Sequence, residues 1–235
     1  MENMRNNLDR RQLVAGAVLA AGGVSSAPAA RSQPATPGFA PRPLPFDPKR
    51  VPGLSEALLV SHHDNNYAGA VKRLGAIRAE VAGQDPAAMP GYRLNGLKRE
   101  ELLAWNSMIL HELYFAGLAG GGAPAPGLGA AIERDFGSHA RWVAEFAAMG
   151  KALGGGSGWV LLTWSRRDGR LVNVWAADHT MSLADGAPLL ALDMYEHAYA
   201  MDYGAKAGAY VDAFMKAFGW GEANRRFERE GRQEG

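Results

Sequence analysis

The spacing of apolar residues changes once along the chain, and this change limits the folds open to it. Apolar residues recur at helical spacing in segments 54–81, 98–120 and 127–153, so each segment predicts a helix. Ser55 is a candidate N-cap for the first helix, and a loop rich in proline and glycine separates that helix from the second. Because consecutive antiparallel helices form a hairpin, the first two segments predict an N-terminal helical hairpin.

Short β-rich runs then replace the helical spacing. Residues 158–179, GWVLLTWSRRDGRLVNVWAADH, contain two such runs around RRDGR, which is typical of a β-hairpin. Residues 187–195, APLLALDMY, predict a third strand, and residues 209–230 predict a closing helix. This order indicates an α+β fold. We expect an N-terminal antiparallel helical hairpin followed by a C-terminal domain with a three-stranded antiparallel sheet and helices.

Composition excludes several kinds of protein. The chain has 235 residues, of which 47% are hydrophobic, enough for one sizeable domain or two small ones with a proper core. Its net charge of +1 gives no electrostatic argument for a nucleic-acid partner. The chain has no cysteine, which excludes disulfides, thiolate metal sites and cysteine nucleophiles.

The N-terminal residues follow the order that is typical of a signal peptide. Arg10 and Arg11 precede an apolar run from Leu13 to about Val24, and the small-residue stretch APAA follows. The run is short for a bilayer span, and the paired arginines indicate a twin-arginine signal. We expect a signal peptide over residues 1–30, a periplasmic or otherwise exported protein, and no stable membrane association after cleavage. An uncleaved anchor or a simple N-terminal tail is the alternative.

Proline marks the passage from this leader to the folded body. Residues 31–50, RSQPATPGFAPRPLPFDPKR, are proline-rich and predict a linker. We expect the linker to span residues 31–43 and the body to begin near Leu44. The expected domains are then a helical hairpin domain over 44–122 and an α/β domain over 123–235.

One short stretch, DMYEHAYAMDY, raises the question of a metal ion. It places Asp193 and His197 four residues apart, and on a helix such residues share a face. A buried carboxylate is costly unless it is paired or binds a metal. With His62 and His111, each in the middle of a predicted helix, the set becomes three imidazoles and one carboxylate, which suits zinc, iron, manganese or copper. Each histidine could equally be an ordinary core or surface residue, and either His62 or His63 could face an ion.

Several stretches in the same order resemble the iron/manganese superoxide dismutase family. The most specific is DMYEHAYAMDYGAKAGAYVDAF, which is similar to the family's Asp-x-x-Glu-His-Ala-Tyr signature. Weaker matches are LPFDP, SHHDNNY, LHELYF and GSGWVLL. Together they extend over roughly residues 44 to 230.

The resemblance implies a redox enzyme with one iron or manganese ion per subunit. Its expected ligands are His62, His111, Asp193 and His197, and its expected substrate is superoxide, which is converted to hydrogen peroxide and oxygen. Zinc is unsuited to this reaction because it has no accessible redox change. Glu196 is expected to reach a partner subunit and hydrogen-bond the partner's copy of His197, so the resemblance implies a homodimer or a tetramer.

The resemblance also assigns the surroundings of the metal. His179 takes the place of the family residue that holds the metal's solvent ligand, although it could be an ordinary loop histidine. Trp159, Tyr195 and Phe115 are expected to wall the pocket. Phe115 and Tyr195 stand where tryptophan is common in the family.

Three positions depart from the family pattern. Asn66 stands where a histidine is usual, and Ala70 and Ala200 stand where tyrosines are usual. The loss of a positioned proton donor typically costs a factor of about 10² to 10⁴ in rate. A metal-binding homologue with weak or no dismutase activity is therefore the alternative function, and a zinc hydrolase that uses the same ligands is a second one.

Overall fold

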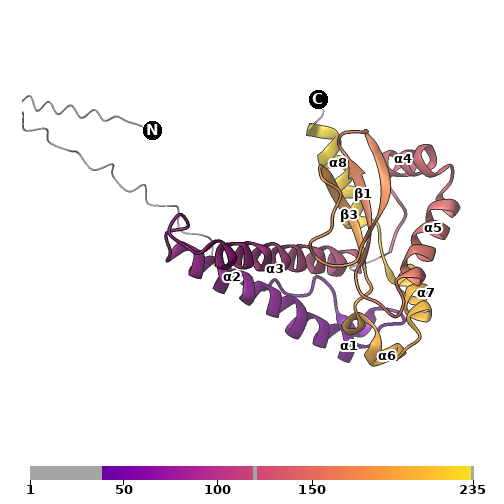
Figure 1. Ribbon diagram of the computed structural model, residues 1–235. Coiled ribbons are helices and arrows are strands. Elements are labelled where there is room, and N and C mark those ends of the chain that lie inside the picture. The colour runs from indigo at the N-terminus through magenta and orange to yellow at the C-terminus, as the bar shows by residue number, and fades with distance from the viewer. Residues whose placement is uncertain (1–38, 119–120, 234–235) are drawn as a thin grey trace, which may run out of the picture. The chain divides into compact units, whose positions relative to one another are not determined.

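The computed structural model describes residues 39–118 and 121–233 (Figure 1). The expected signal peptide and most of the expected linker lie outside these residues. The described part of the chain belongs to one compact unit, Gly38–Gly235. The finer boundary between residues 44–122 and 123–235 stays a prediction. Among the helices in the described ranges, none is both long and apolar enough to cross a membrane.

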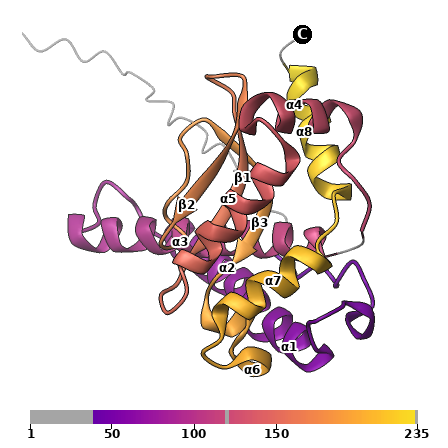
Figure 2. The same cartoon turned by 90° about the vertical axis from the view of Figure 1, so that its right-hand side faces the viewer.

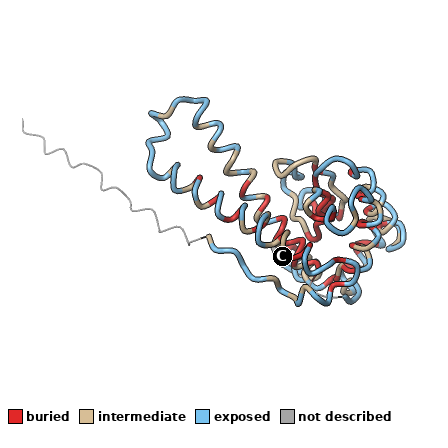
Figure 3. The backbone as a smooth tube through the Cα atoms, turned by 90° about the horizontal axis from the view of Figure 1, so that it is seen from below, coloured by how far each residue is buried: buried red, intermediate tan, exposed pale blue. Residues whose placement is uncertain are grey.

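The N-terminal half is a helical hairpin, as the sequence predicts. After a short 3-10 helix, η1 (Pro48–Arg50), the first arm consists of α1 (Glu56–Ser61), the π-helix η2 (His62–Tyr67) and α2 (Ala68–Ala82). The second arm is α3 (Gly91–Gly117), which packs along α2. The two arms run side by side in Figures 1 and 3.

Both arms differ in detail from the prediction. Ser55 caps α1 as expected, and its hydroxyl accepts the amide of Leu58 at 3.1 Å. Continuous α-helix over 54–81 is wrong, because a π turn interrupts the first arm. The second arm begins at Gly91 rather than at residue 98, because extended Pro90 leads directly into it. A proline next to a helix start costs little, since the first helical amides lack intrahelical partners.

Two helices follow where the sequence predicted one over 127–153. They are α4 (Pro126–Phe136) and α5 (His139–Ala152). Gly137 ends α4 with a φ of 83°, a left-handed conformation that costs glycine little. Ser138 then starts α5, because its hydroxyl accepts the amide of Arg141 at 3.1 Å.

The three-stranded antiparallel sheet is confirmed. Its strands are β1 (Trp159–Ser165), β2 (Arg170–Ala176) and β3 (Gly186–Asp193), in the order β2-β1-β3. The register pairs Trp159 at the start of β1 with Asp193 at the end of β3. The sheet therefore holds these two residues side by side.

Helices cover both faces of the sheet. In Figures 1 and 2, α4 and α5 lie on one face, and α3 and α8 lie on the other. This double cover explains why every residue of the central strand β1 is buried, since alternate side chains point to opposite faces. Figure 3 shows buried residues concentrated where the hairpin meets the sheet, whereas the far end of the hairpin is mostly exposed.

The chain closes with short helices rather than one helix over 209–230. A 3-10 helix, η3 (Glu196–Ala198), and α6 (Ala200–Tyr203) follow the sheet. The last two helices are α7 (Ala207–Ala217) and α8 (Gly221–Gln233). The residues between them are extended at Phe218, so α8 can turn back to the sheet.

Candidate metal centre

The structure brings together the four residues that the sequence singled out as ligands. One ligand atom from each of His62, His111, Asp193 and His197 lies within 4.8 Å of the others. The Asp193 Oδ2 atom lies 3.1 Å from His62 Nε2, 3.6 Å from His111 Nε2 and 3.3 Å from His197 Nε2. The first three residues are almost fully buried, and His197 is a quarter exposed.

The four residues come from four separate elements. His62 lies on η2, His111 on α3, Asp193 at the end of β3 and His197 on η3. Asp193 and His197 therefore do not share a helix. The amide of Tyr195 donates to Asp193 Oδ1 at 2.9 Å, and this turn brings His197 back to the carboxylate.

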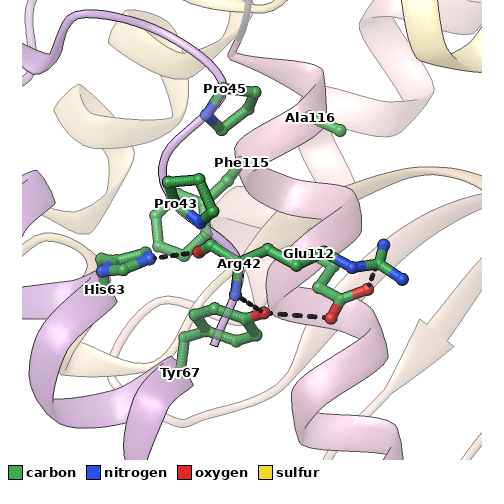
Figure 4. A pocket seen from close by; sticks show the side chains of 8 residues that line it. All are labelled: Arg42, Pro43, Pro45, His63, Tyr67, Glu112, Phe115 and Ala116. Carbon is green, nitrogen blue, oxygen red and sulfur yellow. Dashed lines mark hydrogen bonds and ion pairs between the residues drawn. The ribbon is translucent and has the colours of Figure 1, made fainter. Parts of the chain in front are cut away.

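His62 and not its neighbour His63 faces the cluster. His63 Nε2 lies 2.8 Å from the carbonyl oxygen of Arg42, and His63 Nδ1 lies 2.7 Å from Asp64 Oδ1. Figure 4 shows His63 turned toward the segment that carries Arg42. The choice between the two histidines, which the sequence left open, thus follows from the path of residues 39–46.

A separate pocket of about 150 Å³ lies beside His63 (Figure 4). Tyr67 donates to Glu112 Oε1 at 3.0 Å and accepts the Arg42 amide at 2.8 Å. The Arg42 guanidinium pairs with Glu112 at 3.0 Å. Phe115 lines this pocket and also contacts the His62 ring, with centroids 5.1 Å apart. Phe115 is therefore shared between the pocket and the surroundings of the cluster.

Burial and hydrogen bonding set the charges of the cluster. Burial alone would raise the pKa of Asp193, but hydrogen bonds with His197 and His62 outweigh it and hold that pKa far below its usual range. Burial lowers the pKa of His62, and it lowers the pKa of His111 to about 3. At neutral pH the cluster thus holds an ionised Asp193 carboxylate and neutral imidazoles at His62 and His111, which are the forms that bind metals.

The His111 ring has a fixed proton position. Its Nδ1 donates to the carbonyl oxygen of Ser107 at 2.6 Å, and the Ser107 hydroxyl lies 3.3 Å from the same nitrogen. The lone pair of the neutral ring is therefore on Nε2, the atom that faces Asp193. Such a bond behind a ligand is the usual way in which a protein orients a metal-binding imidazole.

The donor set fits a first-row transition metal. Metal–nitrogen and metal–oxygen bonds of about 2.1 Å place neighbouring ligand atoms roughly 3 to 3.5 Å apart. The Asp193 Oδ2 distances of 3.1, 3.6 and 3.3 Å agree with this spacing. Imidazoles with a carboxylate suit iron and manganese. The site can therefore hold one iron or manganese ion.

Aromatic residues form one wall of the cluster. The Tyr195 ring stacks between the rings of His179 and His197, at centroid distances of 4.8 and 5.3 Å. Trp159 Nε1 donates to His179 Nδ1 at 3.0 Å. Burial lowers the pKa of His179. The predicted wall residues Trp159, Tyr195 and Phe115 thus all lie around the cluster, and His179 is held among them.

A cavity of about 320 Å³ lies beside the cluster, between α2 and α3. Asn66 and Ala70, two of the positions that depart from the family pattern, both line it. His179 and Ser107 also line it, so the cavity reaches the residues that contact the cluster. Position 70, where the resemblance leads one to expect a tyrosine, holds only the methyl side chain of alanine.

Sequence reasoning missed a buried pair behind Asp193. The Tyr210 hydroxyl donates to the Asp193 carbonyl oxygen at 2.8 Å and lies 3.3 Å from the Tyr114 hydroxyl. Both tyrosines are fully buried. In the sequence they sit at ordinary core positions of their helices, and no local signal distinguishes them from packing residues.

Similarity to known proteins agrees with this site. The model of the family "Iron/manganese superoxide dismutases, C-terminal domain" matches residues 124–226. A superoxide dismutase [Fe] of Cupriavidus metallidurans is 65% identical over 186 residues, which cover 79% of this chain and 94% of that protein. Superoxide dismutase [Mn] 1 of Halobacterium salinarum is 35% identical over 190 residues, covering 79% and 93% of the two chains. Superoxide dismutase [Fe] of Aquifex aeolicus is also 35% identical over 190 residues, covering 77% and 88%.

The relative that is 65% identical covers 79% of this chain, and three histidines and one aspartate converge in the structure. The chain therefore belongs to the iron/manganese superoxide dismutase family.

Proposed function

We propose that His62, His111, Asp193 and His197 hold the metal ion with which this chain converts superoxide to hydrogen peroxide and oxygen. Two superoxide ions and two protons give one molecule of each product. A bound ion with two accessible oxidation states supplies the electron exchange that both halves of this reaction need. The observation that carries the proposal is the convergence of four ligand atoms from distant segments within 4.8 Å.

The metal that we propose is iron, one ion per subunit. The relative with 65% identity is named an iron superoxide dismutase, whereas the one manganese relative named above is 35% identical. Elemental analysis of protein purified from its native source tests this directly. Manganese as the main metal would overturn the choice of iron without affecting the ligands.

We infer that His179 presents a proton to the pocket from Nε2. The Trp159 indole N–H donates to Nδ1, so Nδ1 is an acceptor and the proton of the neutral ring is on Nε2. The lowered pKa of His179 favours that neutral ring. A proton held at a defined atom matters here, because formation of hydrogen peroxide consumes two of them.

The ligand assignment is tested with Asp193→Ala. Removal of the only carboxylate of the set should reduce metal content after purification at least about tenfold, because the remaining imidazoles lack a balancing charge. Asp212→Ala is the control, since Asp212 is exposed on α7. If Asp193→Ala retains metal as well as the parent does, the assignment is wrong.

The rate is a separate question, because Ala70 leaves the cavity without a tyrosine hydroxyl. The alternative, a metal-binding homologue with little turnover, predicts a rate no better than that of the free metal ion. Superoxide disappearance, followed with metal-loaded protein and with an equal concentration of free ion, separates the two functions. We expect the protein to be faster by orders of magnitude.

We also propose a homodimer in which Glu196 bonds the partner's copy of His197. Glu196 is exposed on η3. The neighbouring elements α1 and α6 carry the exposed apolar residues Val60 and Met201. Exposed apolar side chains on the elements next to Glu196 agree with the proposed interface. Sedimentation equilibrium should give a dimer for the parent and a smaller species for Met201→Glu; a parent monomer would refute the proposal.

Export through a twin-arginine signal is proposed from Arg10 and Arg11. Replacement of both by lysine should leave the protein in the cytoplasmic fraction, whereas the parent reaches the periplasm. An equal distribution of the two proteins would refute the proposal.

A further inference from the structure

The segment that precedes the first helices, residues 39–46, lies against both arms of the hairpin, and we call it the N-terminal strap. At its start, the Phe39 ring lies 5.0 Å from the Arg78 guanidinium of α2. Leu44 and Phe46 pack against the main core. Between these two anchors, Arg42 contacts residues of η2 and of α3 (Figure 4).

The π-helix η2 binds Arg42 through its main chain. The Arg42 amide donates to the Tyr67 hydroxyl at 2.8 Å, and the Arg42 carbonyl oxygen accepts His63 Nε2 at 2.8 Å. Pro43 follows directly and disfavours a helical conformation at Arg42. Two side chains of one π turn therefore hold both main-chain groups of a single strap residue.

The same residue reaches the other arm of the hairpin. The Arg42 guanidinium pairs with Glu112 Oε2 at 3.0 Å, and the Tyr67 hydroxyl donates to Glu112 Oε1 at 3.0 Å. The Arg42 side chain is 77% exposed, so solvent weakens its ion pair. Tyr67 is buried, and a buried group that loses its hydrogen-bond partner costs more. The hydroxyl of Tyr67 is therefore the main connection.

These contacts lie one residue away from two of the four ligands. His63 follows His62 on η2, and Glu112 follows His111 on α3. The His62 and His111 rings contact each other edge to face, with centroids 4.9 Å apart. Ligand geometry has to be held within about 0.5 Å, so a small shift of η2 against α3 changes the spacing of these two ligands.

We propose that Arg42 is a positioning residue, which joins η2 to α3 through His63, Tyr67 and Glu112 and thereby slows the loss of the metal ion. The effect on metal retention depends on the proposed function, because it needs an ion at the four ligands. The connection between the two arms depends only on the contacts of the strap.

The experiment compares three variants of the full chain. Tyr67→Phe keeps the ring but removes the hydroxyl that bonds the Arg42 amide and Glu112. Arg42→Ala removes the ion pair but keeps both main-chain groups of residue 42. Phe39→Ala is the control, because it loosens the strap at Arg78 and removes no contact of His63, Tyr67 or Glu112.

The rate at which the metal-loaded protein gives up its ion to EDTA is measured at 25 °C, together with the EPR spectrum of the bound ion and the melting temperature. We expect Tyr67→Phe to speed the release about tenfold and to change the spectrum. Arg42→Ala should speed it about twofold at most. Phe39→Ala should change neither the release nor the spectrum, even where it lowers the melting temperature.

Equal release rates in Tyr67→Phe and Phe39→Ala would overturn the proposal, and so would an unchanged spectrum in Tyr67→Phe. Hydrogen exchange on the metal-free protein tests the connection without an ion. Amides of residues 62–67 should exchange faster in Tyr67→Phe than in the parent, and equal exchange would overturn the role of the strap. A parent that binds no metal would refute the proposed function, while hydrogen exchange still decides whether the strap joins the arms.

Discussion

Gly158→Ala tests whether the start of β1 supports the metal centre. Gly158 has a φ of 133°, a conformation that residues with a side chain rarely adopt. A Cβ there would lie 2.0 Å from the carbonyl oxygen of Ala176 and 3.0 Å from the Cα of Ala177. Both neighbours are backbone atoms at the end of β2, so no side-chain rotation can relieve the overlap.

The cost has two parts. A residue forced into such a conformation pays about 1 to 3 kcal/mol, and displacement of the adjoining strand adds lost ladder hydrogen bonds and packing. Together they should lower the free energy of unfolding by roughly 3 to 5 kcal/mol. For a chain of this size each kcal/mol corresponds to about 2 to 4 °C, so we expect a melting temperature lower by roughly 10 °C.

The metal should be affected as well. The Gly158 carbonyl accepts the amide of Met194 at 2.9 Å, and the next residue, Trp159, pairs with Asp193 in the sheet. A shift of Gly158 therefore moves Met194 and Trp159, the residues next to Asp193 in the chain and in the sheet. We expect metal content to fall together with stability in Gly158→Ala, as measured by elemental analysis after dialysis.

Gly156→Ala is the matched control, because its added Cβ makes only an ordinary contact of 3.5 Å with the Leu153 carbonyl oxygen. It should melt within a few degrees of the parent and keep its metal. If Gly158→Ala is as stable as Gly156→Ala, the argument from backbone conformation fails. If Gly158→Ala is unstable but keeps its full metal content, the proposed effect of Gly158 on the metal ligand Asp193 is refuted.

Three further predictions concern single contacts. Trp159→Phe removes the N–H that fixes His179 and should lower kcat about threefold at unchanged metal content; an unchanged kcat would remove the tautomer argument. Ala70→Tyr should exceed Ala70→Phe in kcat by about tenfold, because only the first adds a proton donor; equal rates would mean that the hydroxyl is not needed. Burial would raise the pKa of Asp135, but bonds from its arginine neighbour and from the Leu171 amide, at 2.7 Å, outweigh it and lower that pKa. The stability from this bond is present above about pH 4 and is lost as the pH falls below it. Measured by urea unfolding, the free energy of unfolding of Asp135→Asn should therefore fall less between pH 5 and pH 3 than that of the parent. Equal losses in the two proteins would refute the assignment.

The sequence predicted the elements whose signals are local. The β-hairpin around RRDGR and the cap at Ser55 are both set by residues within a few positions of each other. The ends of the helices were harder to predict from the sequence. The start of α3 at Gly91 was hidden by the proline and glycine around it, and the break at Gly137 depends on one residue with positive φ. A single residue of this kind changes the pattern of apolar residues over a whole segment very little.

The π turn could not be predicted from local signals. Residues 62–67, HHDNNY, contain neither proline nor glycine, the usual marks of a break in a helix. The turn is accompanied by distant contacts, such as those of Tyr67 with Glu112 and with the Arg42 amide. These contacts join parts of the chain that no local pattern relates, so residues 62–67 alone do not indicate the interruption.

The candidate site was predictable where ligand chemistry marks the residue. His62, His111, Asp193 and His197 stand out because buried imidazoles and carboxylates need a partner. Tyr210 supports the Asp193 carbonyl equally directly, yet a buried tyrosine on a helix usually only packs. A supporting residue of this kind is recognisable only from the partner of its hydroxyl, which is a three-dimensional fact.

The sheet fixes the position of the ligand Asp193 relative to Trp159, the residue that orients His179. Trp159 and Asp193 are partners in the β1–β3 ladder, so the residue that fixes His179 and the residue that binds the three imidazoles are spaced by backbone hydrogen bonds. Side chains supported by regular elements are held more precisely than those on loops. A change that slides β3 along β1 should therefore disturb His179 and Asp193 together. A change confined to η3 should move His197 alone.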